Sequence, residues 1–176
     1  MASRIPIEPL EPGESPDSDV DAFLGDAQQG WILNPKLMAL YARVPEGLKG
    51  WRRMVDGLVD TIGPVTWEVV AHRTAAVTGN RYETTHADET VRKEIAALRP
   101  AVCASELDAA ALSKRHYLAA ALAEGVARHE VPPELFRKVQ DEYSTSELVG
   151  LCMAASLAHV AQLVSDALGV SPETAN

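Results

Sequence analysis

The chain contains little cysteine, few aromatic residues and no excess of basic charge. Its 176 residues include two cysteines, Cys103 and Cys152, too few for the disulfide framework of a small secreted domain. Lys and Arg total 16 against 25 Asp and Glu, and no basic stripe collects in one segment. Because nucleic-acid binding depends on Lys and Arg contacts to phosphates, this balance argues against a nucleic-acid partner.

Long hydrophobic runs are also missing. Polar residues interrupt the apolar stretches before they reach the ~18 residues of a membrane span. Met1–Leu10 contains one Arg and lacks the apolar segment of a signal peptide. We therefore expect a cytoplasmic protein that has no membrane partner, and the low cysteine content agrees with a reducing compartment.

The sequence is rich in helix-forming apolar residues. Hydrophobic residues make up 47% of the chain, and most of them are Ala, Leu and Val, of which Ala and Leu favour helices most strongly. No segment shows the alternating β-branched pattern of strands. We predict an all-α fold, a compact bundle of about six to eight helices.

The N-terminal residues differ from the rest. Residues 1–20 are rich in Pro, Glu, Asp and Ser, which predicts an extended arm without a core of its own. Such an arm is either disordered or wraps a neighbouring subunit. Residues 21–176 are predicted to form a single all-helical domain.

Capping residues, proline and glycine divide that domain into helices. Asn34 and Pro35 begin the first, Gly79 and Gly169 end two others, and Arg99-Pro100 is expected to close another. The later predicted helices are Glu46–Thr61, Val65–Thr78, Arg81–Leu98, Ser105–Leu112, Lys114–His129, Pro133–Tyr143 and Leu148–Leu168.

One segment, residues 68–86, combines acidic residues and histidines in a way that suggests chemistry. Glu68 and His72 are four residues apart, so they share one face of an otherwise apolar helix. A buried carboxylate is costly unless it is paired. If Glu68 is buried, it either pairs with Arg73 or a histidine, or has a raised pKa suited to proton transfer. The alternative is that Glu68 lies at a subunit contact or on the exposed edge of the helix.

After the turn at Gly79, three more polar residues lie close together: Asn80, Glu83 and His86. Glu83 and His86 are three residues apart and would face the same way on a helix. Helix capping alone would explain Asn80 and Glu83, since they occupy the N-cap and third helical positions. His86 can equally be an ordinary, partly buried histidine.

The spacing of these residues resembles the alkylhydroperoxidase D (AhpD) / carboxymuconolactone decarboxylase family. In that family a Glu is followed, twelve residues later, by a C-x-Y-C-x-x-H motif. The corresponding residues here are Glu68 and then Asn80-Arg81-Tyr82-Glu83-Thr84-Thr85-His86. Weaker similarities are Asn34-Pro35-Lys36-Leu37, Ser146-Glu147-Leu148-Val149 and Ala167-Leu168-Gly169-Val170, so the resemblance covers most of residues 31–170.

The resemblance implies an all-α bundle that assembles as dimers to hexamers. Dithiol members of the family reduce hydroperoxides with a C-x-x-C pair, but here Asn80 and Glu83 occupy the two cysteine positions. Neither an amide nor a carboxylate can replace a thiolate nucleophile. We therefore do not expect a dithiol hydroperoxide reductase.

The decarboxylase branch, which lacks these cysteines, implies a different activity. By that resemblance the protein would be a cofactor-independent acid/base enzyme acting on a small organic acid, lactone or carbonyl compound. His86 would be the base or acid, Glu68 would relay its proton, and Glu83 would share the relay. Tyr82, Asn80 and His72 would position the substrate. The alternative is a non-catalytic oligomeric binding or scaffold protein that retains the fold.

No metal or cofactor is expected. The five histidines show no H-E-x-x-H spacing, and the sequence contains no C-x-x-C pair and no glycine-rich phosphate loop. A homo-oligomer is expected because the helices 114–129 and 148–168 carry apolar residues on more than one face. The expected partners are therefore a small-molecule substrate and further copies of the chain.

Overall fold

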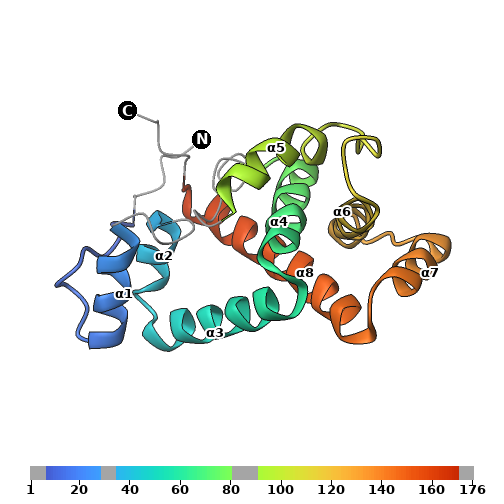
Figure 1. Cartoon of the computed structure of the whole chain (residues 1–176). Coiled ribbons are helices and arrows are strands. Elements are labelled where there is room, and N and C mark those ends of the chain that lie inside the picture. The colour runs from blue at the N-terminus through green and yellow to red at the C-terminus, as the bar shows by residue number, and fades with distance from the viewer. Residues whose placement is uncertain (1–6, 29–34, 81–90, 171–176) are drawn as a thin grey trace.

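The structure, a computed structural model, describes residues 7–28, 35–80 and 91–170. Within these ranges all regular secondary structure is α-helical, which confirms the all-α prediction (Figure 1). The helices are α1 (Ser18–Gln28), α2 (Pro35–Tyr41), α3 (Pro45–Ile62), α4 (Pro64–Thr78), α5 (Arg92–Val102), α6 (Lys114–Ala127), α7 (Pro133–Glu142) and α8 (Thr145–Leu168).

Local sequence signals set most of the helix boundaries. Helices α2, α3, α4 and α7 begin with proline, whose fixed φ and missing N–H suit the first helical position. Gly79 and Gly169 end α4 and α8 in the left-handed conformation, with φ of 77° and 69°, which glycine adopts without strain. At the start of α8, Ser144 and Glu147 form the reciprocal capping box.

Helices α4 and α8 form the centre of the bundle. Helix α4 packs against α5, α6 and α8, while α8 also packs against α3 and α6 (Figure 1). Their contact surface includes Val70, Leu151 and Ala155, all at or below 1% exposure. By length and composition α8 could cross a membrane, but 56% of its most apolar stretch is buried in the bundle. The apolar character of both helices is therefore largely explained by packing within the chain.

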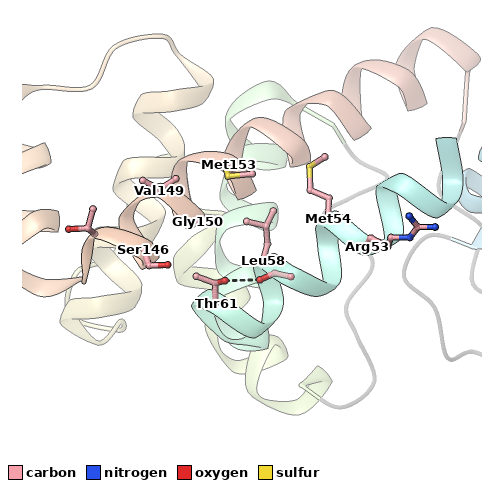
Figure 2. Close-up of a pocket in the computed structure, with 10 residues that line it drawn as sticks. Arg53, Met54, Leu58, Thr61, Ser146, Val149, Gly150 and Met153 are labelled. Carbon is pink, nitrogen blue, oxygen red and sulfur yellow. Dashed lines mark hydrogen bonds between the residues drawn. The ribbon is translucent and has the colours of Figure 1, made fainter. Parts of the chain in front are cut away.

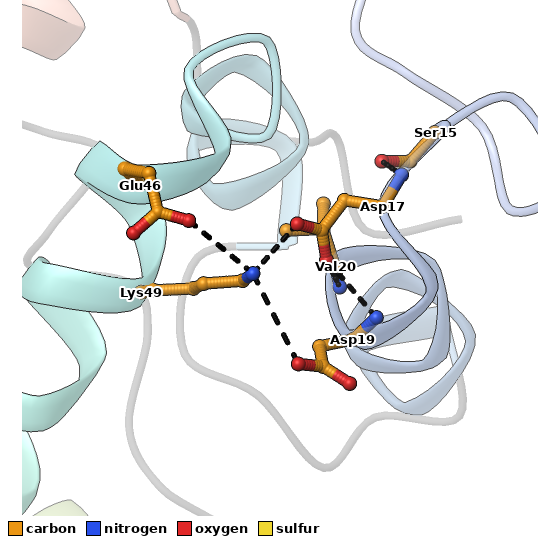
Figure 3. Close-up of polar contacts among 6 residues, drawn as sticks. All are labelled: Ser15, Asp17, Asp19, Val20, Glu46 and Lys49. Carbon is orange, nitrogen blue, oxygen red and sulfur yellow. Dashed lines mark hydrogen bonds and ion pairs between the residues drawn. The ribbon is translucent and has the colours of Figure 1, made fainter.

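The N-terminal segment packs on its own chain. The Leu10 amide donates to the Ala39 carbonyl, and the Arg43 side chain donates to the Glu8 carbonyl. Lys49 of α3 lies 2.6 Å from an Asp17 carboxylate oxygen, next to Asp19 and Glu46 (Figure 3). These contacts hold residues before α1 against α2 and α3, and α1 itself begins at Ser18, within the segment assigned to the arm.

The predicted helix over Ser105–Leu112 is wrong. The structure has bends and turns there, because the Asp108 carboxylate accepts hydrogen bonds from the Ala110 and Ala111 amides at 2.9 and 3.3 Å. Such local bonds compete with helix formation. Ser105 and Asp108 consequently form no capping box in this segment.

The predicted helix end at Arg99-Pro100 is also wrong. Helix α5 continues through Pro100 to Val102. Proline removes one intrahelical hydrogen bond, but Ala101 and Val102 are buried at 6% and 1% exposure, and the Cys103 amide still donates to the Arg99 carbonyl. Packing beyond the proline therefore offsets the lost bond. Among the described residues α5 begins at Arg92, and the predicted start at 81 lies outside them.

Candidate functional site

Glu68 and His72 form a buried pair on α4. The Glu68 Oε2 and His72 Nε2 atoms are 3.5 Å apart, and both residues are 2% exposed. Their burial follows from the position of α4, which other helices surround on several sides. The four-residue spacing aligns the two side chains on one face, as expected from the sequence. An exposed helix edge, the less specific alternative for Glu68, is ruled out.

Arg73 is the partner of Glu124, not of Glu68. Its Nε donates to Glu124 Oε2 at 2.9 Å, and its Nη1 donates to the carbonyls of Val102 and Ala104 at 3.0 and 2.6 Å. The Arg73 side chain is 2% exposed, so these partners compensate a buried charge. The sequence offered Arg73 or a histidine as the partner of Glu68, and the structure places His72 beside it.

The ion pair with Arg73 changes the pKa of Glu124. Burial by itself would raise the pKa of the Glu124 carboxyl. The hydrogen bonds and positive charges of Arg73 and Arg128 outweigh burial and hold that pKa below its ordinary value. Sequence reasoning missed this pair, because Arg73 and Glu124 are 51 positions apart.

Asn80 connects the end of α4 to α8. Its Nδ2 donates to Ser165 Oγ at 2.9 Å and to Asp166 Oδ1 at 3.1 Å, and the residue is 3% exposed. Thr78 adds a hydrogen bond to the Gln162 side chain at 2.6 Å. These hydrogen bonds direct the Asn80 side chain toward α8, and its substrate-positioning role stays a prediction.

The other three candidates, Tyr82, Glu83 and His86, lie outside the described residues. Asn80 precedes their segment, and Val91, 8% exposed, follows it as the N-cap of α5. Their predicted roles remain predictions.

A cysteine that sequence reasoning assigned no role contacts the backbone of α4 at His72. The Cys103 thiol at the end of α5 is 3.9 Å from the His72 carbonyl oxygen. Burial raises the pKa of this thiol, and the positive charges of Arg99 and Arg73 oppose the increase only partly. Cys152 belongs to α8, its pKa is also raised by burial, and both cysteines are free. No group of three His, Cys, Asp or Glu side chains among the described residues could hold a metal ion.

A pocket of about 610 Å³ lies elsewhere, between α3 and α8 (Figure 2). Met54 and Leu58 of α3 face Val149, Gly150 and Met153 of α8 across it. Of the candidate site residues that the structure describes, Glu68, His72 and Asn80, none lines this pocket.

Comparison with solved structures identifies the architecture. The chain superposes on an alkylhydroperoxidase AhpD core structure, an uncharacterized peroxidase-related protein from Ralstonia eutropha JMP134, with a TM-score of 0.72. The match covers 95% of this chain and 94% of that chain at 15% sequence identity. The chain has the AhpD-like fold. No protein-family model matches the sequence, and no curated protein matches it.

The AhpD-like fold confirms the structural part of the resemblance seen in the sequence. Helices α4 and α8 carry the described candidates and their contacts: Glu68, His72 and Asn80 belong to α4 or its end, and the Asn80 partners belong to α8. At this identity the likeness establishes the fold alone, so the chemistry of the site rests on this chain's own residues.

Proposed function

We propose that the protein is a cofactor-independent acid/base enzyme of the carboxymuconolactone decarboxylase type, acting on a small organic acid, lactone or carbonyl compound. The buried Glu68–His72 pair, at 3.5 Å within the bundle, is the observation that carries the proposal. A carboxylate beside an imidazole stabilises the protonated ring and can relay its proton, which is the work of a general acid/base pair.

In the proposed step a base removes a proton from the carbon next to a carbonyl group. The C–H electron pair then forms an enolate, and the proton goes to imidazole. His86 is proposed as this base, Glu68 and Glu83 as its relay, and Tyr82 with His72 as residues that position the substrate. The imidazolium then exchanges its proton with solvent and returns one to the enolate carbon, which regenerates the neutral imidazole in a cycle that needs no oxidant or metal.

Hydrogen–deuterium exchange tests this proposal, because it detects proton abstraction whatever product is finally formed. A panel of small lactones and oxo acids is incubated with the protein in deuterated water, and loss of the proton signal next to the carbonyl is followed by NMR. We expect exchange by the wild-type protein, at least tenfold slower exchange with Glu68→Gln, and none above background with His86→Ala, since general acid/base catalysis contributes about 10²–10⁴-fold.

His159→Ala is the matched control, because His159 lies on α8 and outside the proposed site. Its exchange rate should equal that of the wild type. Unchanged exchange in both Glu68→Gln and His86→Ala would refute the assignment of the site.

A second candidate function is a non-catalytic binding or scaffold protein. It is favoured by the burial of Glu68 and His72, both 2% exposed, and by the position of the α3–α8 pocket, which none of the described candidates lines. On this alternative no compound of the panel would exchange, and none would shift the histidine NMR signals of the wild-type protein.

A further inference from the structure

The pocket between α3 and α8 has the size and the lining of a small-molecule site. Its volume of about 610 Å³ lies within the roughly 300–1,000 Å³ that is usual for such sites. Most of its wall is apolar or small, and consists of Met54, Gly57, Leu58, Val149, Gly150 and Met153 (Figure 2). The two methionine side chains are flexible and adapt to the shape of what they contact. This wall therefore suits the hydrocarbon part of a ligand.

The two ends of the pocket are polar, and one of them is charged. Ser146 lies at one end and Arg53 at the other (Figure 2). Of the described residues that line the pocket, Arg53 alone is charged. No carboxylate in the described part of the chain forms an ion pair with Arg53, whereas the neighbouring Arg52 lies 2.9 Å from Asp56. Arg53 is therefore an unpaired cation at the edge of an apolar wall.

We propose that this pocket binds a medium-chain carboxylate, with the acyl chain between α3 and α8 and the carboxylate at Arg53. The planar guanidinium group matches the geometry of a carboxylate. From Thr145 to Met153 the pocket follows α8 for about 12 Å, the length of an extended acyl chain of about ten carbons. This inference is independent of the proposed acid/base activity, because none of the candidate residues described for that activity lines the pocket.

Calorimetric titration of the full-length protein with decanoate, below its micelle concentration, tests the site. We expect one decanoate per chain. Octanoate should bind about fifteenfold more weakly, since each CH₂ group that the wall covers tightens binding about fourfold. Arg53→Gln should weaken decanoate binding about fivefold, the upper range for an exposed ion pair, and leave binding of the uncharged 1-decanol unchanged. Arg52→Gln is the matched control, because Arg52 does not line the pocket, and it should bind decanoate like the wild type.

Filling the pocket provides a second test. Gly57 and Gly50 are both exposed on α3, and a Cβ added at either meets nothing within 4 Å. Only Gly57 lines the pocket. Gly57→Leu should therefore weaken decanoate binding at least tenfold, because its side chain occupies space that the acyl chain needs. Gly50→Leu should keep the wild-type affinity, and both variants should retain the wild-type far-UV circular dichroism.

The methionine methyl groups report where the ligand binds. In ¹³C NMR spectra decanoate should shift the methyl signals of Met54 and Met153, which line the pocket, and leave that of Met38, which is 6% exposed in another part of the core. The proposal would be overturned by no binding of decanoate, by equal effects of the two arginine variants or of the two glycine variants, or by unshifted Met54 and Met153 signals. It would also be overturned if sedimentation showed that decanoate dissociates an assembly, because a second copy of the chain would then occupy the pocket.

Discussion

Arg73 of α4 and Glu124 of α6 form an ion pair in which the arginine is 2% exposed and the carboxylate 26% exposed. The guanidinium also binds the Val102 and Ala104 carbonyls at and after the end of α5. One side chain therefore connects α4 to α6 and to the end of α5. Removing a partner from such a contact leaves a buried charge, which costs more than the intact pair contributes.

Glu124→Gln should lower the free energy of unfolding by about 3 kcal/mol, because Arg73 would keep its charge without its counter-ion. Asp56→Asn removes the corresponding partner from the exposed Arg52–Asp56 pair and should cost less than about 1 kcal/mol. Urea unfolding at neutral pH and one fixed protein concentration measures both. Equal losses in the two variants would contradict the importance assigned to the Arg73 contact.

The same contact predicts a pH dependence. The pKa of Glu124 is lower in the folded chain than its ordinary value, so the unfolded chain binds the proton more tightly. The Arg73–Glu124 contact therefore contributes its full stabilisation above the ordinary glutamate pKa of about 4.3. This stabilisation is lost as the pH falls through the lower pKa that Glu124 has in the folded chain. The difference in unfolding free energy between wild type and Glu124→Gln should shrink in acid. A difference that grows in acid would contradict this assignment.

Gly150→Ala should destabilise the protein by about 1–3 kcal/mol, the usual cost of overpacking. The new Cβ would lie 2.9 Å from a methyl group of Ile62, a β-branched side chain with little rotamer freedom in a helix. Gly50→Ala is the control, because a Cβ at this exposed position of α3 meets nothing within 4 Å. It should stabilise by about 0.5–1 kcal/mol through helix propensity. Thermal unfolding of both variants measures the contrast.

Replacing Cys103 and Cys152 by serine should leave deuterium exchange of the substrate panel unchanged. Burial raises the pKa of both thiols, so little reactive thiolate is present at neutral pH. The double variant should keep the wild-type rate and circular dichroism. A folded double variant that has lost exchange would show that a thiol, and not the carboxylate–imidazole pair, carries the chemistry.

The comparison of sequence and structure separates local from long-range effects. Prolines at the first helical position, Gly79 and Gly169 at helix ends, and the Ser144–Glu147 capping box were all predictable, since each acts within one turn of helix. The same holds for the Glu68–His72 pair, which needs only the four-residue period. The sequence composition predicted an all-α bundle, and the AhpD-like fold was expected from the resemblance of Glu68 and the segment 80–86 to the motif of that family.

What the sequence could not decide depends on contacts between distant segments. Helix α5 extends past Pro100 because Ala101 and Val102 are buried, and Arg73 binds Glu124 because α4 packs against α6. Likewise, the sequence indicated that residues 148–168 are apolar on several sides. Only the packing of the bundle decides which side of α8 is buried and which is exposed. Local steric and hydrogen-bonding rules act on neighbouring residues, whereas the burial that selects partners and surfaces is a property of the whole bundle.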